Sequence, residues 1–125
     1  MSSAVNTKKA PAAIGPYSQA IVTGNLVFTS GQIPINPETG IIVGENIAEQ
    51  AEQVCKNISA VLEAAGSSVD KTVKTVCYLK NMEDFTAFNE VYSAYFVSRP
   101  ARSCVSVKAL PKDALVEIEA IAERN

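Results

Sequence analysis

The amino-acid sequence predicts an α+β domain in which two helices cover one face of a mixed sheet. Two observations lead to this prediction. Runs of β-branched residues alternate with two amphipathic stretches, and their order is strands, helix, strand, helix, two strands. A chain of 125 residues forms one domain, 1–125, and leaves no room for a separate regulatory module. The second face of the sheet must then meet water or another subunit.

The first strands are predicted to form a hairpin. Residues 1–16 are rich in Ala, Pro, Lys and Ser, and we expect them to form an extended N-terminal arm. Two β-branched runs follow, at residues 20–23 and 26–29. Because only Gly24 and Asn25 separate these runs, a tight hairpin turn is expected between them.

Two helices are expected in the middle of the chain. Residues 47–65 place apolar side chains every three or four positions, which gives one apolar helix face. Asn46 is suited to the N-cap, and Gly66 stands where a glycine commonly ends a helix. Asn81 is expected to cap the second helix, and Pro100 to prevent its continuation. The face of that helix is aromatic and consists of Phe85, Phe88, Tyr92, Tyr95 and Phe96.

Three further strands are predicted, at residues 72–79, 103–109 and 115–123. We expect the last two to form an antiparallel hairpin through the loop 110–114, with Glu117 near Lys108. Alternation would then give both strands an apolar face, made of Val105, Val107 and Ala109 with Val116, Ile118, Ala120 and Ala122. The opposite face would carry Arg102, Cys104, Ser106 and Lys108 together with Glu117, Glu119, Ile121 and Glu123.

Composition excludes several function classes. The chain has no histidine, so Ser-His-Asp and Cys-His catalysis, paired-histidine ribonuclease chemistry and the common histidine-containing zinc sites are excluded. A net charge of −2 offers no basic surface for tight binding of phosphates. Three widely spaced cysteines favour neither a disulfide scaffold nor a metal site. Since the first 16 residues have no long apolar run, we expect a cytoplasmic protein.

The last two predicted strands also carry the candidate site residues. Arg102 follows Pro100, which restricts its backbone, and an arginine fork is a good receptor for a carboxylate. Glu117 and Glu119 could act as acid, base or water-positioning groups, although the same spacing also fits an ordinary solvated face. In the expected hairpin Glu117 lies beside Lys108, and Cys104 is four residues from Lys108, roughly 13 Å along the strand. One small ligand would hardly reach Arg102 and Glu117 of the same chain, so a shared site is predicted between subunits.

Several short motifs, in this order and spacing, resemble the RidA branch of the Rid family, the reactive intermediate/imine deaminases. Older labels for that family are endoribonuclease L-PSP and translation inhibitor. The motifs span nearly the whole chain and lie at residues 13–19, 29–34, 37–40, 100–105, 110–111 and 116–122. The resemblance implies a chorismate-mutase-like α+β fold and a homotrimer with sites between neighbouring subunits.

The resemblance also implies an activity and its residues. The activity is hydrolysis of 2-imino acids, such as those formed when 2-aminoacrylate tautomerises, to 2-oxo acids and ammonia without a cofactor. Arg102 would clamp the substrate carboxylate, and Glu117 would orient the attacking water and exchange protons. Five further residues would bind the substrate or line its pocket: Tyr17, Ser30, Gly31, Asn89 and Cys104.

The chain departs from the family pattern before Arg102. Only three residues separate Phe96 from Pro100, where family members usually have a longer segment that ends in an aromatic residue. Arg99 stands in the place of that aromatic residue. It would add a second positive charge near Arg102 that attracts anionic substrates.

Two other functions remain open at this point. The protein could bind small carboxylates or 2-oxo acids without turning them over, or it could be a single-stranded RNA endoribonuclease that inhibits translation. The presence of Glu117 favours the enzyme, because a carboxylate receptor has little use for a second acidic group. The absence of histidine and of interleaved aromatic and basic residues disfavours a ribonuclease.

Overall fold

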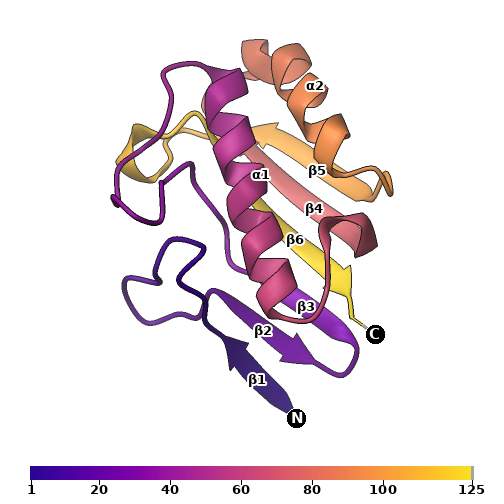
Figure 1. The fold of residues 1–125 in the computed structure, drawn as a ribbon. Helices are drawn as coiled ribbons and strands as arrows, with labels where there is room; N and C mark the ends of the chain where they lie inside the picture. Colours follow the sequence, from indigo (N-terminus) through magenta and orange to yellow (C-terminus); the bar gives the residue numbers. More distant parts are fainter. Residues whose placement is uncertain (125) are drawn as a thin grey trace.

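A computed structural model describes residues 1–124 and shows two layers, a sheet and a pair of helices on one of its faces (Figure 1). Within these residues the sheet has six strands, in the order β1-β2-β3-β6-β4-β5. β4 and β5 run parallel, and the other neighbours are antiparallel. The predicted α+β fold with a mixed sheet and both helices on one face is therefore confirmed. The strands are β1 (Ser2–Val5), β2 (Ala20–Thr23), β3 (Leu26–Thr29), β4 (Thr72–Leu79), β5 (Ala101–Ser106) and β6 (Val116–Glu123); the helices are α1 (Ile47–Ala64) and α2 (Phe85–Tyr95).

The first hairpin forms as predicted. β2 and β3 pair antiparallel around Gly24, whose φ of 57° lies in the left-handed region that a tight hairpin turn requires. β1 pairs with β2 and is the edge strand, so the expected arm of residues 1–16 contains a strand of the sheet. Buried Gln19 fixes the remainder of that segment. Its Oε1 accepts from the Thr7 N–H at 2.7 Å, and its Nε2 donates to the Pro11 carbonyl at 2.8 Å.

Helix α1 begins and ends where the sequence predicted. The Glu49 N–H donates to Asn46 Oδ1 at 2.9 Å, which confirms the N-cap. Gly66 follows the helix with a φ of 83°. The apolar face of α1 is fully buried against the sheet and includes Val54, Ile58, Val61 and Leu62.

Helix α2 begins later than predicted, and its expected cap is wrong. Asn81 precedes a 3₁₀ turn, Met82–Asp84, and its side chain makes no capping hydrogen bond. Two adjacent acidic residues in that turn, Glu83 and Asp84, lead directly into α2. The aromatic face is confirmed in its buried part, because Phe88 is inaccessible to solvent and the Tyr92 hydroxyl is hydrogen-bonded to buried Thr75 Oγ1 of β4, with 2.6 Å between the oxygens.

The expected hairpin between the last two strands is wrong. β4 lies between β5 and β6, and Glu117 is opposite Tyr78 instead of Lys108. The reason is a βαβ crossover: α2 carries the chain back over the sheet, so β5 starts at the same end as β4 and pairs with it in parallel. β6 then returns to the sheet centre, where its four apolar residues are fully buried. Those residues are Val116, Ile118, Ala120 and Ala122.

The two faces of β5 are also the reverse of the prediction. Cys104 is opposite Cys77 of β4, and paired residues share a sheet face. Because Cys77 is buried under the helices, Cys104 and Arg102 also face the helix side. Ser103 and Val105 are exposed instead. As an edge strand covered only by α2, β5 does not need an apolar inner face.

Two kinds of feature are absent from residues 1–124. No group of three or more His, Cys, Asp and Glu side chains is placed to hold a metal ion. Neither helix in this part of the chain combines the length and the apolar character that a membrane crossing requires.

The hydrogen bond between Tyr92 and Thr75 generates a prediction about how α2 is held on the sheet. Tyr92→Phe leaves the buried Thr75 hydroxyl with only the weak contact of the Cys77 thiol, 3.9 Å away, and we expect a loss of about 1–3 kcal/mol in the free energy of unfolding. The double variant Tyr92→Phe/Thr75→Val removes both hydroxyls and should recover a large part of that loss. Urea unfolding at one fixed protomer concentration measures both effects. Equal losses in the single and double variants would contradict this role of the hydroxyl pair.

Candidate functional site

The seven predicted site residues fall into two groups in the structure. Asn89, Arg102 and Cys104 belong to α2 and β5 at one edge of the sheet, on its helix side. The other four residues, Tyr17, Ser30, Gly31 and Glu117, line a separate cavity. The chain therefore brings the members of each group together and keeps the two groups apart.

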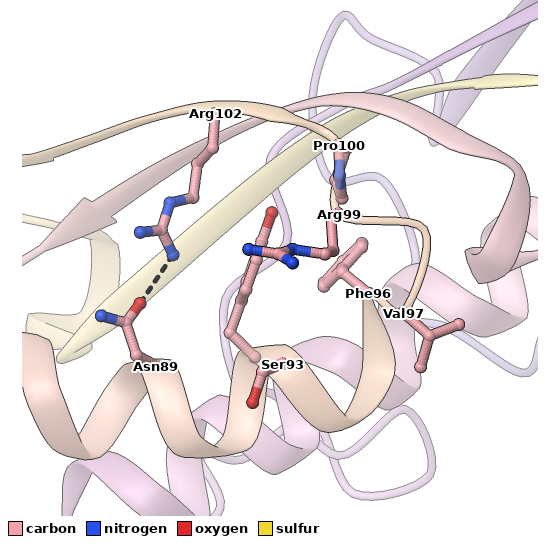
Figure 2. Close-up of a pocket in the computed structure, with 8 residues that line it drawn as sticks. Asn89, Ser93, Phe96, Val97, Arg99, Pro100 and Arg102 are labelled. Carbon is pink, nitrogen blue, oxygen red and sulfur yellow. Dashed lines mark hydrogen bonds between the residues drawn. The ribbon is translucent and has the colours of Figure 1, made fainter.

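The first group surrounds Arg102. A cavity of about 700 Å³ lies between α2, which contributes Asn89 and Ser93, and the segment from Val97 to Arg102 (Figure 2). Arg102 Nη1 donates to Asn89 Oδ1 at 2.7 Å. The guanidinium carbon lies 4.8 Å from the ring centroid of Tyr92, a distance at which an arginine and an aromatic ring attract each other.

Arg102 is thus a fixed cation with unused donors. Among the described residues, Asn89 accepts its only side-chain hydrogen bond, and no carboxylate forms an ion pair with it. The ring centroid of Phe85, at the start of α2, lies 5.4 Å from the same guanidinium carbon. The remaining N–H groups of the guanidinium can bind a carboxylate in a planar, two-point arrangement.

Arg99 lines the same cavity and sits in an unusual backbone conformation. Its φ is 54°, in the left-handed region that is uncommon for a long side chain. The Arg99 N–H donates to the Phe96 carbonyl at 3.1 Å, so the short connection after α2 closes as a tight turn. Figure 2 shows the Arg99 side chain extending back over α2, into the space that Arg102 also faces.

Cys104 is placed as a packing residue. It is half-buried against the core, next to Cys77 on the paired strand. Burial raises the pKa of the Cys104 thiol, and the nearby Arg102 charge only partly opposes this shift. A raised pKa keeps the thiol protonated at neutral pH, which is unfavourable for a nucleophile.

The second group surrounds Glu117. A cavity of about 620 Å³ lies between the N-terminal segment around Tyr17, the stretch from Ser30 to Ile35, and Glu117 on β6. Gly31 lies directly against Glu117: a methyl group added at Gly31 would overlap Glu117 Oε2, so any larger residue here would displace the carboxylate. Ser30 Oγ donates to the Ser18 carbonyl at 2.6 Å and fixes the strand end.

Glu117 has two polar neighbours: Glu119, which the sequence analysis considered, and Tyr78, which it did not single out. Burial, and secondly the negative charge of Glu119, raise the pKa of the Glu117 carboxyl. Glu119 itself accepts a hydrogen bond from the Tyr78 hydroxyl at 2.8 Å. Alternation along β4 already indicates that Tyr78 and Cys77 lie on opposite faces of the sheet. The partner of Tyr78 could be identified only once the register between β4 and β6 was known.

Arg102 and Glu117 of one chain lie on opposite faces of the sheet. Glu117 alternates with Val116 and Ile118, which are buried on the helix side, so its side chain projects from the other face. Arg102 is on the helix side, under α2. The predicted register, which separated Arg102 from Glu117 along the strands, is wrong. In the observed register the two side chains are separated because they lie on opposite faces of the sheet.

Comparison with known proteins identifies the family. A family model described as endoribonuclease L-PSP matches residues 7–124. The chain belongs to this family. This L-PSP protein is 58% identical over 120 residues to a RutC family protein of Pyrococcus abyssi, with 95% of this chain and 94% of that one covered. It is 49% identical over 129 residues to the 2-iminobutanoate/2-iminopropanoate deaminase of Escherichia coli, with 100% of both chains covered.

A solved structure agrees with both the fold and the family of this L-PSP protein. The crystal structure of Escherichia coli TdcF with bound serine superimposes with a TM-score of 0.93 at 44% identity, covering 98% of this chain and 99% of that one. The resemblance that the short motifs indicated is thereby confirmed for the family.

Proposed function

We propose that this L-PSP protein hydrolyses reactive 2-imino acids to 2-oxo acids and ammonia, at sites formed between the subunits of a homotrimer. One observation carries the proposal. The chain holds a fixed arginine without an ion-pair partner among the described residues and a half-buried carboxylate of raised pKa, each beside its own cavity, on opposite faces of one sheet. These are the two groups that the reaction needs, and a neighbouring subunit can bring them together.

A ring of subunits accounts for the separation of the two groups. If the helix-side edge of one subunit meets the open sheet face of the next, Arg102 of the first approaches Glu117 of the second. Such a head-to-tail interface closes into a ring with identical sites. It also covers the sheet face that the helices leave open.

The substrate is held by its carboxylate. In this proposal the Arg102 fork binds the carboxylate, and Asn89 together with the ring of Tyr92 keeps the fork in place. Serine, the ligand in the TdcF structure, carries the same α-carboxylate as a 2-imino acid. Backbone groups of Gly31 and Cys104 would complete the binding of the carboxylate and the imine end, with Tyr17 and Ser30 lining the pocket.

The chemistry requires one water molecule and one proton-exchanging group. The protonated imine is electrophilic at carbon, and the Glu117 carboxylate orients water towards that carbon and accepts a proton as the C–O bond forms. Glu117 then returns this proton to the nitrogen of the carbinolamine, and it accepts the hydroxyl proton as the C–N bond breaks and the C=O bond forms. Ammonia and a 2-oxo acid leave. Water is the only co-reactant, so the proposal includes no cofactor, and the protonated thiol of Cys104 takes no covalent part.

The main test follows imine lifetime. An amino-acid oxidase generates 2-iminobutyrate, and semicarbazide traps whatever imine has not been hydrolysed. We expect wild type to suppress semicarbazone formation, and Arg102→Ala and Glu117→Gln each to lower kcat/KM by roughly 100-fold or more, because each removes a charged group from the transition state. Lys56→Ala, on the exposed side of α1, is the matched surface control and should behave as wild type.

The same assay separates the enzyme from the alternatives. Light scattering and circular dichroism first establish that the variants remain folded and assembled. If wild type leaves semicarbazone formation unchanged but binds 2-oxobutyrate through Arg102, the protein is a receptor for small carboxylates and the enzymatic proposal is wrong.

The raised pKa of Glu117 generates a second prediction, for the pH dependence of the rate. Glu117 must be ionised to accept a proton, so kcat/KM should rise with pH through the raised pKa of this carboxyl. Glu119→Gln removes the neighbouring negative charge while keeping an acceptor for Tyr78, so the pKa falls and the acidic limb moves to lower pH.

A carboxylate farther along the same strand provides the control. Glu123→Gln removes the same charge from the same face of β6, roughly 20 Å from Glu117, and should leave the acidic limb in place. A profile that does not move in Glu119→Gln, or that moves equally in both variants, would contradict the role assigned to Glu119.

A further inference from the structure

The cavity beside Arg102 contains a second, uncompensated cation. Arg99 and Arg102 both line it, and no Asp or Glu is among the lining residues within 1–124. Neither arginine forms an ion pair with another described residue. Figure 2 shows the two side chains approaching the same space over α2 from two directions. Two guanidinium groups facing one cavity create a positive potential that favours a ligand with two negative charges.

The backbone holds Arg99 in this position. Its left-handed φ and the hydrogen bond from its N–H to Phe96 turn the chain sharply, and Pro100 restricts the next residue. Tight turns of this kind have little conformational freedom, so the Arg99 side chain starts from a defined point on the cavity rim. The polar groups of Asn89 and Ser93 complete the wall opposite it.

The spacing of the two arginines sets the size of the ligand. They are three residues apart, so their Cα atoms are at most about 10 Å apart, and both long side chains extend into the cavity. If Arg102 binds the α-carboxylate, Arg99 can reach a second carboxylate two or three carbons farther along. The cavity of about 700 Å³ has room for a ligand of this length.

We infer that Arg99 selects substrates with a second acidic group, namely 2-imino dicarboxylates of four or five carbons, over 2-imino acids with apolar side chains. This inference rests on the proposed function and names the substrate class of the same site. Arg99 does not take part in bond making or breaking. It binds the distal carboxylate of the substrate.

The test compares two substrates in three variants. An oxidase acting on aspartate or glutamate supplies a dianionic imine, an oxidase acting on 2-aminobutyrate supplies 2-iminobutyrate, and semicarbazide reports both. Arg99→Asn removes the charge with a residue that tolerates the left-handed backbone. We expect it to lower kcat/KM about fivefold to tenfold for the dianionic imine, mainly through KM, and less than about twofold for 2-iminobutyrate. Arg99→Lys should restore most of the loss, and Lys56→Ala should change neither value.

Each other outcome overturns a defined claim. One such outcome is that wild type hydrolyses 2-iminobutyrate while Arg99→Asn lowers kcat/KM equally for both substrates or for neither. In that case the claim that Arg99 selects dicarboxylates is wrong, and the proposed function stands. If wild type hydrolyses no imine, both are wrong. If Arg99→Asn changes the oligomer mass instead of selectivity, the arginine binds a carboxylate of another subunit and the inference fails.

Discussion

The parallel pairing of β5 with β4 is the constraint on which the rest of the structure depends. It follows from the α2 crossover, and it puts Cys104 opposite Cys77, so that Arg102 faces the helices. It also leaves the centre of the sheet to β6, whose apolar residues face α1 while Glu117 faces away. A single topological choice thus places Arg102 and Glu117 of one chain on opposite faces of the sheet, and in the proposed function a neighbouring subunit completes the site.

Each half of the site carries charge that has no ion-pair partner among the described residues. Arg99 and Arg102 face a cavity without an acidic partner in the described chain, and Glu117 is partly desolvated beside Glu119. Partial burial of the Glu117 carboxylate costs hydration, which is why its pKa is raised. Arg99 is exposed and keeps its hydration. In the proposed assembly the substrate carboxylate would pair with the arginines, and the protonated imine would pair with Glu117. Binding and catalysis would then use the same uncompensated charges.

The fold class and α1 could be predicted because their signals are local. Apolar residues at helical spacing, an Asn at the N-cap and a Gly after the last turn each act within a few residues. The pairing of β5 and β6 could not, since nearness in sequence favours a hairpin and nothing local reveals that β4 lies between them. Arg102, Glu117 and Glu119 stood out on the last two predicted strands, and the separation of Arg102 from Glu117 was predicted from a hairpin that does not form. The other site residues were named by resemblance. Which sheet face each group occupies, and the contact of Tyr78 with Glu119, required the observed register.

Subunit complementation tests the central claim most directly. Arg102→Ala and Glu117→Gln are refolded together at equal amounts, and heterotrimers are isolated by two affinity tags. If each site takes Arg102 from one subunit and Glu117 from its neighbour, one of the three sites in every isolated heterotrimer carries both native residues, and about one third of the wild-type imine hydrolysis returns. Mixing Arg102→Ala with the double variant Arg102→Ala/Glu117→Gln should restore nothing. Heterotrimers of the two single variants that remain as inactive as their parents would contradict a site shared between subunits.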